Sequence, residues 1–488
     1  MRISILAFLL FLVFGCVASK DETPAEIAAR RLPLELCNID GIEEPLLCGT
    51  FSAPEDWDDP EGPKIDISVI VVPAADGNPA NQAWTEHQGG PGRVGLSSVG
   101  FFLKTETGQA FRATRDIVLF DQRGAGESGG LYCEALRTPI LEAYYTAEKI
   151  ARCREEMTAA GVRLQNYSTL AAVDDLEGIR KWLGYEQFDV GGWSYGSRFL
   201  LTYAQRYPDS IRTMMVALPT IFDYRRPLDW PRFSEDAIEG LFADCAAQPE
   251  CNEAFPDLRN DLATLLETLE AQPVEVEYFN PVTETTARAE LNRSRMVDEI
   301  HAALLRVRSS RLLPLVIHEA AKGNYEPFLL LAVPVRAPRP IAEAQYLSIV
   351  CPEETAFFTT EEAETASAGT FMGLQLANEF KESCAVWGLP PHPDYPLKWV
   401  EQPIPTLVIS GDRDPITPIE YGERITASLS NARHLKIHHM PHDFLGLEGA
   451  SCLDYVLLEF LEKKSPNDVD VSCVSEMRAP PFLVSMPE

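Results

Sequence analysis

Basic side chains are few in this sequence. Its 488 residues include 42 Lys and Arg against 73 Asp and Glu, which gives a formal net charge of −31 at pH 7. Because such an acidic surface repels phosphate backbones and anionic headgroups, we expect no nucleic-acid partner. A Cys-x-x-Cys pair is also missing among the 11 cysteines, which argues against a zinc ribbon or a thioredoxin-type redox site.

Long apolar runs are equally scarce. The single one, Ile5 to Phe14, lies behind Arg2 and is followed by small residues. It is too short for a stable membrane span and typical of a secretory signal, so we predict a signal peptide over residues 1–18 and no transmembrane segment. Two ways of processing this signal stay open: plain cleavage after Ala18, or lipidation of Cys16, because "VFGC" resembles a bacterial lipobox. We therefore expect an exported protein that is periplasmic, attached to a bacterial cell envelope, or secreted.

The cysteine count agrees with export. Without Cys16 ten cysteines remain, and an even number is expected in an oxidising compartment. They fall into neighbours along the chain, from which we predict the disulfides 37–48, 133–153, 245–251, 351–384 and 452–473.

Short apolar runs that end in turn residues alternate with helical patterns. Examples are "RDIVLFDQRG", "QFDVGGWS", "RTMMVALP" and "PTLVISGD". Continuous apolar strands of this kind suit a parallel sheet covered on both faces, and the helical segments between them predict an α/β fold. Residues 226–345 break the alternation with a nearly all-helical pattern. We predict a helical insertion there, between a first core segment (32–225) and a second one (346–488).

The stretch "GGWSYGS" contains a G-x-S-x-G pentapeptide around Ser194. A strand precedes it and a helix follows it, which is the setting of a nucleophile on a sharp strand-to-helix turn. We predict that Ser194 is a catalytic nucleophile; the alternative is a structural glycine-rich turn.

A nucleophilic serine needs a base and a group that orients the base, in the chain order Ser, Asp or Glu, His. In "PTLVISGDRDPITP" Asp414 is the predicted acid and Asp412 the second choice. In "RHLKIHHMPHDFLG" His442 is the predicted base and His439 the alternative. A metal site at this histidine cluster is a competing interpretation that we do not favour; we expect no metal and no cofactor.

Glycines in "HQGGPG" predict the oxyanion hole, because they let backbone N–H groups approach a tetrahedral oxyanion closely. We assign the two donors to the N–H groups of Gly90 and Tyr195.

These motifs, together with "DQRGAGES", "GDRDPITP" and "MPHDFLG", resemble the proline iminopeptidase and tripeptidyl aminopeptidase group of serine peptidases. The stretches "LFADCAAQPECNEAFP" and "SIVCPEE" resemble its tripeptidyl, TAP-like branch. The resemblance implies an α/β-hydrolase fold in which the helical insertion is a cap, a Ser194–His442–Asp414 triad, and cleavage near the free N-terminus of peptides.

The same resemblance implies that acidic residues bind the substrate's amine, for which Glu353 and Glu354 are candidates. Their alternative is an exposed helix start. The sequence departs from the family at Trp193, Gln88 and Pro441, and we interpret Asp121 and Arg123 as a structural ion-pairing turn. An esterase acting on small esters is the alternative activity, and a surface-anchored binding protein with a decayed site is the alternative from another class.

The cysteine pairing gives a direct test. Mass mapping of non-reduced peptides is expected to find five cross-linked pairs of neighbouring cysteines. Free thiols or crossed pairs among the ten would contradict the prediction.

Overall fold

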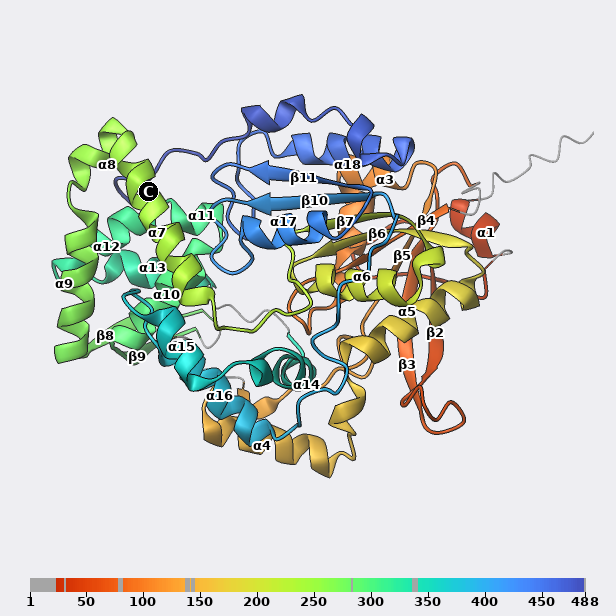
Figure 1. The fold of residues 1–488 in the computed structure, drawn as a ribbon, viewed down its shortest axis with the longest axis horizontal. Helices are drawn as coiled ribbons and strands as arrows, with labels where there is room; N and C mark the ends of the chain where they lie inside the picture. Colours follow the sequence, from red (N-terminus) through yellow and green to blue (C-terminus); the bar gives the residue numbers. More distant parts are fainter. Residues whose placement is uncertain are drawn as a thin grey trace, which may run out of the picture.

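A nine-stranded sheet forms the centre of the molecule (Figure 1). The computed structural model describes residues 23–29, 32–77, 82–136, 141, 145–281, 284–335 and 341–486. The predicted signal peptide, residues 1–18, and Cys16 lie outside them. Among the described residues, no helix combines the length and apolar character needed to cross a membrane.

The strand order is β1-β2-β3-β5-β4-β6-β7-β10-β11. The first three strands are antiparallel, β3 pairs antiparallel with β5, and the strands from β5 to β11 run parallel to one another. Their bounds are β1 Glu35–Cys37, β2 Leu46–Pro54, β3 Lys64–Val72, β4 Gln82–His87, β5 Asp116–Phe120, β6 Gln187–Trp193, β7 Ile211–Ala217, β10 Thr406–Gly411 and β11 Ala432–Ile437.

Helices cover both faces of this sheet, which confirms the predicted α/β class. Successive strand residues point to opposite faces, so Val408 packs in one apolar cluster while Leu407 and Ile409 pack in another. The first cluster includes side chains of α1 (Pro24–Ala29), α5 (Thr169–Leu183), α6 (Tyr195–Arg206) and α17 (Ile419–Ala427), and the second those of α2 (Val99–Lys104), α3 (Glu106–Phe111) and α18 (Ser451–Lys463).

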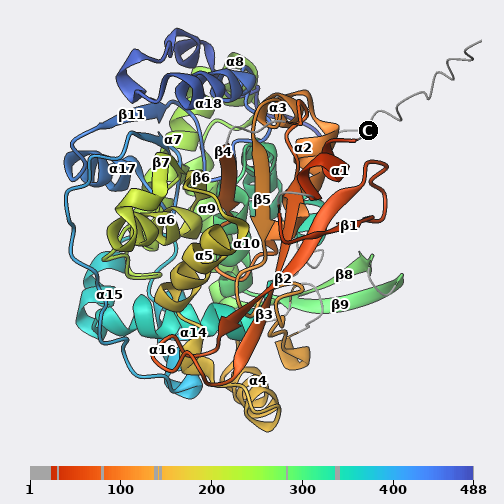
Figure 2. The same ribbon diagram turned by 90° about the vertical axis from the view of Figure 1, so that its right-hand side faces the viewer.

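The inserted region has its own core beside the sheet (Figure 1). Its helices are α7 Trp230–Ala247, α8 Pro249–Ala254, α9 Leu258–Ala271, α10 Arg293–Leu304, α11 Val307–Ser310, α12 Leu313–Ala321 and α13 Glu326–Val335. The expectation of a nearly all-helical insertion is wrong at one place. An antiparallel hairpin of β8 (Val274–Asn280) and β9 (Thr285–Leu291) extends from it (Figure 2). Its alternating burial, with Val276 and Tyr278 buried and Glu275, Glu277 and Phe279 exposed, is the period-two pattern of a strand.

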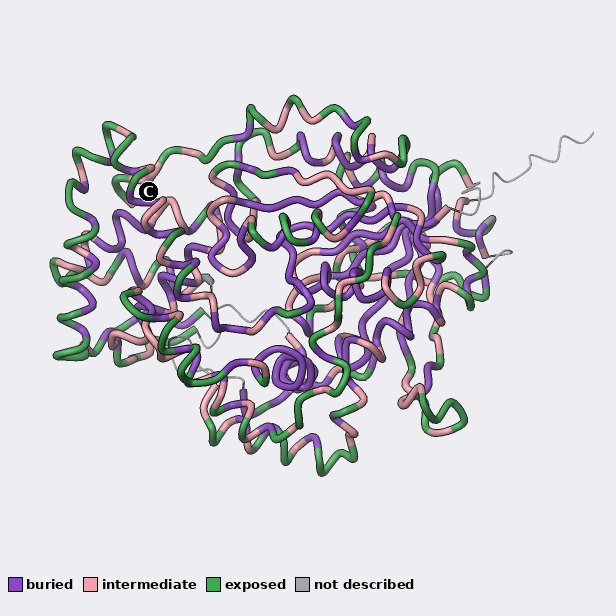
Figure 3. Tube along the Cα trace, in the orientation of Figure 1, coloured by how far each residue is buried: buried purple, intermediate pink, exposed green. Residues whose placement is uncertain are grey.

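Along the chain, a further group of helices follows the insertion and precedes β10: α14 (Glu343–Glu353), α15 (Thr360–Ser367) and α16 (Gln375–Trp387). Helix α14 is buried along its whole length (Figure 3) and packs with α16 and with α4 (Ala147–Ala159). The predicted domain boundary at residue 345 falls inside α14, and the division stays a prediction.

The five predicted disulfides are present, with Cα–Cα distances between 5.1 and 5.8 Å. Two of them fix the group around α14: Cys351–Cys384 joins α14 to α16, and Cys133–Cys153 ties down α4.

Arg123 is completely buried and its guanidinium forms several hydrogen bonds. Asp121 is not its ion-pair partner, so our interpretation of these two residues as an ion-pairing turn is wrong. The Arg123 guanidinium forms a bidentate pair with Asp175 of α5, at 2.7 and 2.6 Å, and donates to the carbonyls of Pro54, Glu55 and Asn166. Asp121 instead accepts from backbone N–H groups of the turn residues Leu96 and Glu127. The spacing within "DQRG" could not reveal a partner 52 residues away.

Replacing Arg123 is expected to destabilise the fold strongly, because Arg123→Ala leaves the Asp175 carboxylate buried without its counter-charge. We expect a loss of about 3–5 kcal/mol in the free energy of unfolding, measured by urea denaturation. Arg225→Ala is the matched control. It removes an ion pair with Glu362 in which both side chains are 35% or more exposed, and is expected to cost less than about 1 kcal/mol. Equal effects of the two variants would contradict this account.

Candidate active site

Ser194 stands alone between the last residue of β6 and the first residue of α6, with φ 56° and ψ −121°. Residues other than glycine avoid a positive φ, so the conformation is held by its surroundings. The N–H of Ser194 donates to Ala217 O of β7, and its carbonyl accepts from the N–H groups of Ser197 and Thr220. The predicted strand-to-helix turn is therefore present.

The turn also depends on close approach by neighbouring backbone. A Cβ added to Gly196 would lie 2.0 Å from His87 O at the end of β4, so any larger residue would displace that strand. Through this contact the "HQGGPG" loop lies directly against the serine; a Cβ on Gly89 would stand 2.9 Å from Ser194 Cβ.

Asp414 and His442 are brought together as predicted. They follow the adjacent parallel strands β10 and β11, whose carboxyl ends meet at the same edge of the sheet as that of β6. His442 Nδ1 lies 2.8 Å from Asp414 Oδ2. With this nitrogen directed at the carboxylate, Nε2 on the other side of the ring is left for a substrate or a nucleophile.

Thr417 is a partner of this pair that sequence reasoning missed. Its hydroxyl donates to Asp414 Oδ2 at 2.5 Å and lies 2.9 Å from His442 Nδ1. Asp414 Oδ1 accepts from the N–H groups of Ile416 and Thr417. The short "DPIT" spacing after the acid was the available signal, since it allows the carboxylate to cap its own turn.

The other histidines and the second acid have separate partners. Asp412 accepts from the N–H of His439 and lies 3.0 Å from His438 Nδ1, while His439 Nδ1 contacts Asp244 of α7 in the cap. His434 is bonded to Ser410. The four clustered histidines thus bind four different side chains, and the described residues contain no group of three metal-binding side chains.

The Ser194 hydroxyl has no hydrogen-bond partner among the described residues, so the link between Ser194 Oγ and His442 is not formed in this state. Hydrogen bonds between catalytic groups are often long without substrate and tighten when it binds. Of the predicted oxyanion donors, the Tyr195 N–H is at the first residue of α6, where a helix supplies no acceptor. Gly90 has φ +114°, a conformation suited to glycine.

Glu353 and Glu354 end α14 and are completely buried, so the alternative of an exposed helix start is wrong. Glu353 accepts from the N–H and hydroxyl of Thr169 at 2.7 and 2.6 Å and contacts Arg198 at 3.1 Å. Glu354 lies 2.9 Å from Arg198 and 2.9 Å from Arg226. Burial raises the pKa of Glu353 to about 7, against the opposing effects of Arg198 and Thr169. Both carboxylates are neutralised within the protein in this state.

The cap contributes a histidine that no motif indicated. His301 of α10 is buried, bonded through Nδ1 to Ser234 of α7 at 2.8 Å, and stacked on Trp230 with ring centroids 5.3 Å apart. Burial lowers its pKa to about 4, although the charge of nearby Asp414 opposes this. Trp193, which departs from the family pattern, is partly buried against the apolar cluster that includes Leu218 and Met440.

With this geometry established, comparison with known proteins identifies the class. Residues 87–274 match the model of the family described as alpha/beta hydrolase fold, and residues 369–473 match TAP-like protein. The strand order and the first family model show the α/β-hydrolase fold, and the relatives described below support a hydrolase. The second match shows that the C-terminal part of the chain is similar to TAP-like proteins.

Three curated relatives show which proteins the chain is similar to. The chain is 24% identical over 458 residues to serine protease Hip1 of Mycobacterium tuberculosis, covering 85% of each chain. It is 27% identical over 265 residues to the tripeptidyl aminopeptidase of Streptomyces lividans, covering 48% of each chain, and 34% identical over 129 residues to the proline iminopeptidase of Xylella fastidiosa, covering 26% of this chain and 30% of the relative.

A solved structure of a proline iminopeptidase from Mycobacterium smegmatis also matches, at 14% identity and a TM-score of 0.37, covering 85% of this chain and 99% of the other. The fold assignment rests on the strand order and the family models rather than on this match.

The buried His301 predicts a pH effect on stability. Its pKa is about 4 in the folded protein, against about 6.5 in an unfolded chain. Between these values the unfolded chain binds more protons, so His301 makes the free energy of unfolding fall as the pH drops from about 6.5 to about 4, by up to about 3 kcal/mol.

His301→Gln is expected to remove this contribution. Urea denaturation of the wild type and the variant at pH 7.5 and pH 4.5 should show a smaller loss of stability for the variant at the lower pH. An unchanged difference between the two pH values would rule out a buried neutral histidine here.

Proposed function

We propose that the protein is an exported serine exopeptidase that hydrolyses peptide bonds near the free N-terminus of peptides. The observation that carries the proposal is the meeting of three strand ends at one edge of the sheet: Ser194 on its strained turn, and the bonded pair Asp414 and His442. The names of the relatives, a serine protease, a tripeptidyl aminopeptidase and a proline iminopeptidase, favour peptides as substrates.

In the proposed reaction Ser194 Oγ attacks the scissile carbonyl while His442 Nε2 takes the hydroxyl proton. Asp414 holds the imidazole through Nδ1 and stabilises the charge that forms on it. The N–H groups of Gly90 and Tyr195 stabilise the tetrahedral oxyanion. His442 then protonates the leaving amine, and water releases the acyl group from Ser194 by the same steps in reverse.

Thr417 supports this arrangement by bonding to both Asp414 and His442. The hydroxyl keeps the carboxylate facing the ring, which favours the tautomer with the proton on Nδ1.

Selection of a free N-terminus needs negative charge near the site. The roles of Glu353 and Glu354 in binding the amine stay a prediction. Their support is the sequence resemblance and, for Glu353, its place near Tyr195: the Glu353 charge opposes ionisation of that tyrosine, whose pKa is raised chiefly by burial. The formal net charge of −31 also favours the approach of a cationic amine over that of an anion.

Export is supported by the five disulfides, since such bonds persist in oxidising compartments. Signal cleavage after Ala18 and lipidation of Cys16 are still two alternatives for the N-terminus.

An esterase acting on small esters is the second candidate, because acyl transfer to a serine serves esters and amides alike. The geometry around Ser194 is compatible with both activities. Activity on p-nitrophenyl esters with none on any peptidyl amide would favour the esterase.

The proposal predicts cleavage that depends on a free amine. Fluorogenic amides of Pro, Ala and Ala-Ala-Pro are expected to be hydrolysed, and N-acetylation of the same peptides should abolish the reaction. Equal turnover of blocked and free peptides would refute the exopeptidase.

Ser194→Ala is expected to lower kcat by about 10⁴-fold or more while leaving the fold intact. A fluorophosphonate probe should label the wild type at Ser194 and leave the variant unlabelled. Absence of labelling in the wild type would instead support a binding protein with a decayed site.

A further inference from the structure

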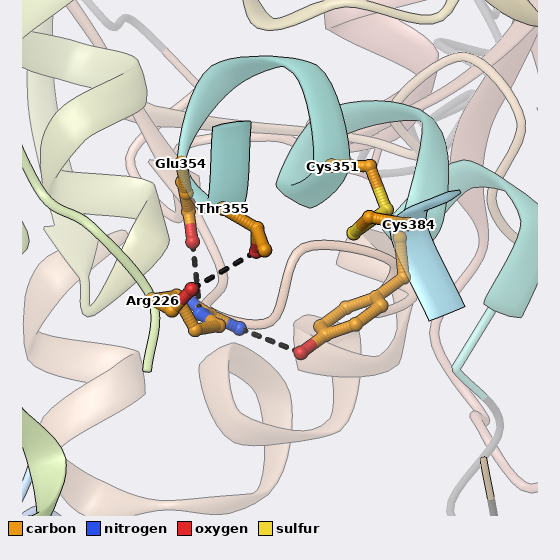
Figure 4. The surroundings of a disulfide bond; sticks show 6 residues. Arg226, Cys351, Glu354, Thr355 and Cys384 are labelled. Atoms are coloured by element: carbon orange, nitrogen blue, oxygen red, sulfur yellow. Dashed lines mark hydrogen bonds and ion pairs between the residues drawn. A yellow bond between two sulfur atoms is a disulfide. The ribbon is translucent and has the colours of Figure 1, made fainter. Parts of the chain in front are cut away.

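Arg226 joins the predicted oxyanion loop to helix α14. It lies between β7 and α7, with its side chain 6% exposed. Its Nη1 donates to Gly90 O at 3.1 Å and to the hydroxyl of Tyr346 at 3.0 Å, and its Nε lies 2.9 Å from Glu354 Oε2. Figure 4 shows this side chain beside Glu354 and Thr355, next to the Cys351–Cys384 disulfide.

The surroundings of Arg226 keep it charged and fixed in place. Its guanidinium lies 5.5 Å from the ring centroids of Tyr224, Trp230 and Tyr346, and such cation–π contacts favour the charged form. Burial is the largest single influence and acts to lower its pKa, but Glu354, Tyr346 and Tyr224 together outweigh burial and the pKa is raised. The contact with Glu354 is one of charge, because no aligned hydrogen bond forms between the two groups.

The glycines of the loop that Arg226 contacts are held through their backbone. Gly89, Gly90 and Gly92 have no side chains to pack, so only backbone contacts fix their conformation. Gly92 O accepts from Ala342 N at 3.0 Å, and Gly90 O accepts from Arg226. Since the N–H and the carbonyl of Gly90 are connected by its own φ and ψ, fixing the carbonyl restricts the direction of the N–H.

We propose that Arg226 is a positioning residue for the oxyanion hole: by holding the Gly90 carbonyl it orients the Gly90 N–H toward the developing oxyanion, and Glu354 in turn holds Arg226. This inference rests on the proposed function insofar as Gly90 is taken as an oxyanion donor. It gives Glu354 a task in the enzyme's acyl transfer that does not require contact with the substrate.

The fork of Arg226 is what the role requires. A lysine at this position keeps the positive charge beside Glu354. Its single ammonium group lacks the planar fork of the guanidinium, so it cannot contact Glu354, Tyr346 and the Gly90 carbonyl at the same time. Arg226 O also accepts from the Thr355 hydroxyl at 2.9 Å, so the residue's backbone is attached to the end of α14. The disulfide to α16 fixes that helix.

Arg226→Lys separates positioning from charge. We expect kcat to fall by about 10- to 100-fold for a peptidyl amide and for a p-nitrophenyl ester alike, with KM changed by less than about 3-fold, because one oxyanion donor is misdirected. A peptide boronate, which mimics the tetrahedral state, should bind more weakly by a similar factor, whereas a product peptide should bind as before. Arg225→Lys, at the neighbouring exposed ion pair with Glu362, is the matched control and should leave kcat unchanged.

Several outcomes would overturn the inference: a folded Arg226→Lys enzyme with wild-type kcat, a loss confined to KM, or a loss of kcat with unchanged binding of the boronate. Folding is monitored by thermal unfolding. If Arg226→Lys does not fold, Tyr346→Phe replaces it in the test. This variant keeps the arginine but removes one of the two acceptors of Nη1. A wild-type kcat together with unchanged binding of the boronate would then overturn the inference as well.

The ester keeps this test separate from the proposed function. Should the enzyme cleave esters but no peptidyl amide, the exopeptidase proposal fails while the effect of Arg226 is still measured on the ester and its boronic acid analogue. Should peptides be cleaved and Arg226→Lys behave as wild type, only the positioning role fails.

Discussion

The hydrogen bond from the Ser194 N–H to Ala217 O holds one residue in a backbone conformation that most residues avoid. That bond crosses from β6 to β7, so the position of the serine depends on the register of two neighbouring parallel strands. The pairing continues through β10 and β11, and Asp414 and His442 lie in the loops that follow these two strands. The three residues are therefore positioned by the carboxyl ends of paired parallel strands.

Buried ion pairs constrain the structure around the site as well. Four charged side chains have little or no exposed surface: Arg198, Arg226, Glu353 and Glu354. Their ion pairs connect α6, the first residues of the inserted region and the end of α14. Burying charges is costly unless they are paired, so each member of this group constrains the others. The start of the inserted region, the loop that contains Gly90 and helix α6 are therefore linked through one group of buried charges.

Much of the fold and most of the candidate residues could be predicted from the sequence, because both follow from local patterns. Apolar runs ending in glycine and aspartate mark β5, β6 and β10, and the G-x-S-x-G and "GDRDP" motifs mark residues at the ends of strands. The disulfides followed from simple adjacency. What could not be predicted depends on contacts between distant segments: the Arg123–Asp175 pair, the burial of Glu353 and Glu354, and the position of His301 near Asp414. The hairpin in the cap was missed although its alternation is visible, since helical neighbours dominated the interpretation of that region.

The arrangement of the disulfides has a consequence for how the chain matures. The ten cysteines that the structure describes are joined in neighbouring pairs along the chain, and none of their bridges encloses or crosses another. A polypeptide emerging N-terminus first into an oxidising compartment would present every cysteine to its proper partner before the following pair appeared. An oxidant that simply joins thiols in their order of arrival would produce the native set, without any later exchange of partners.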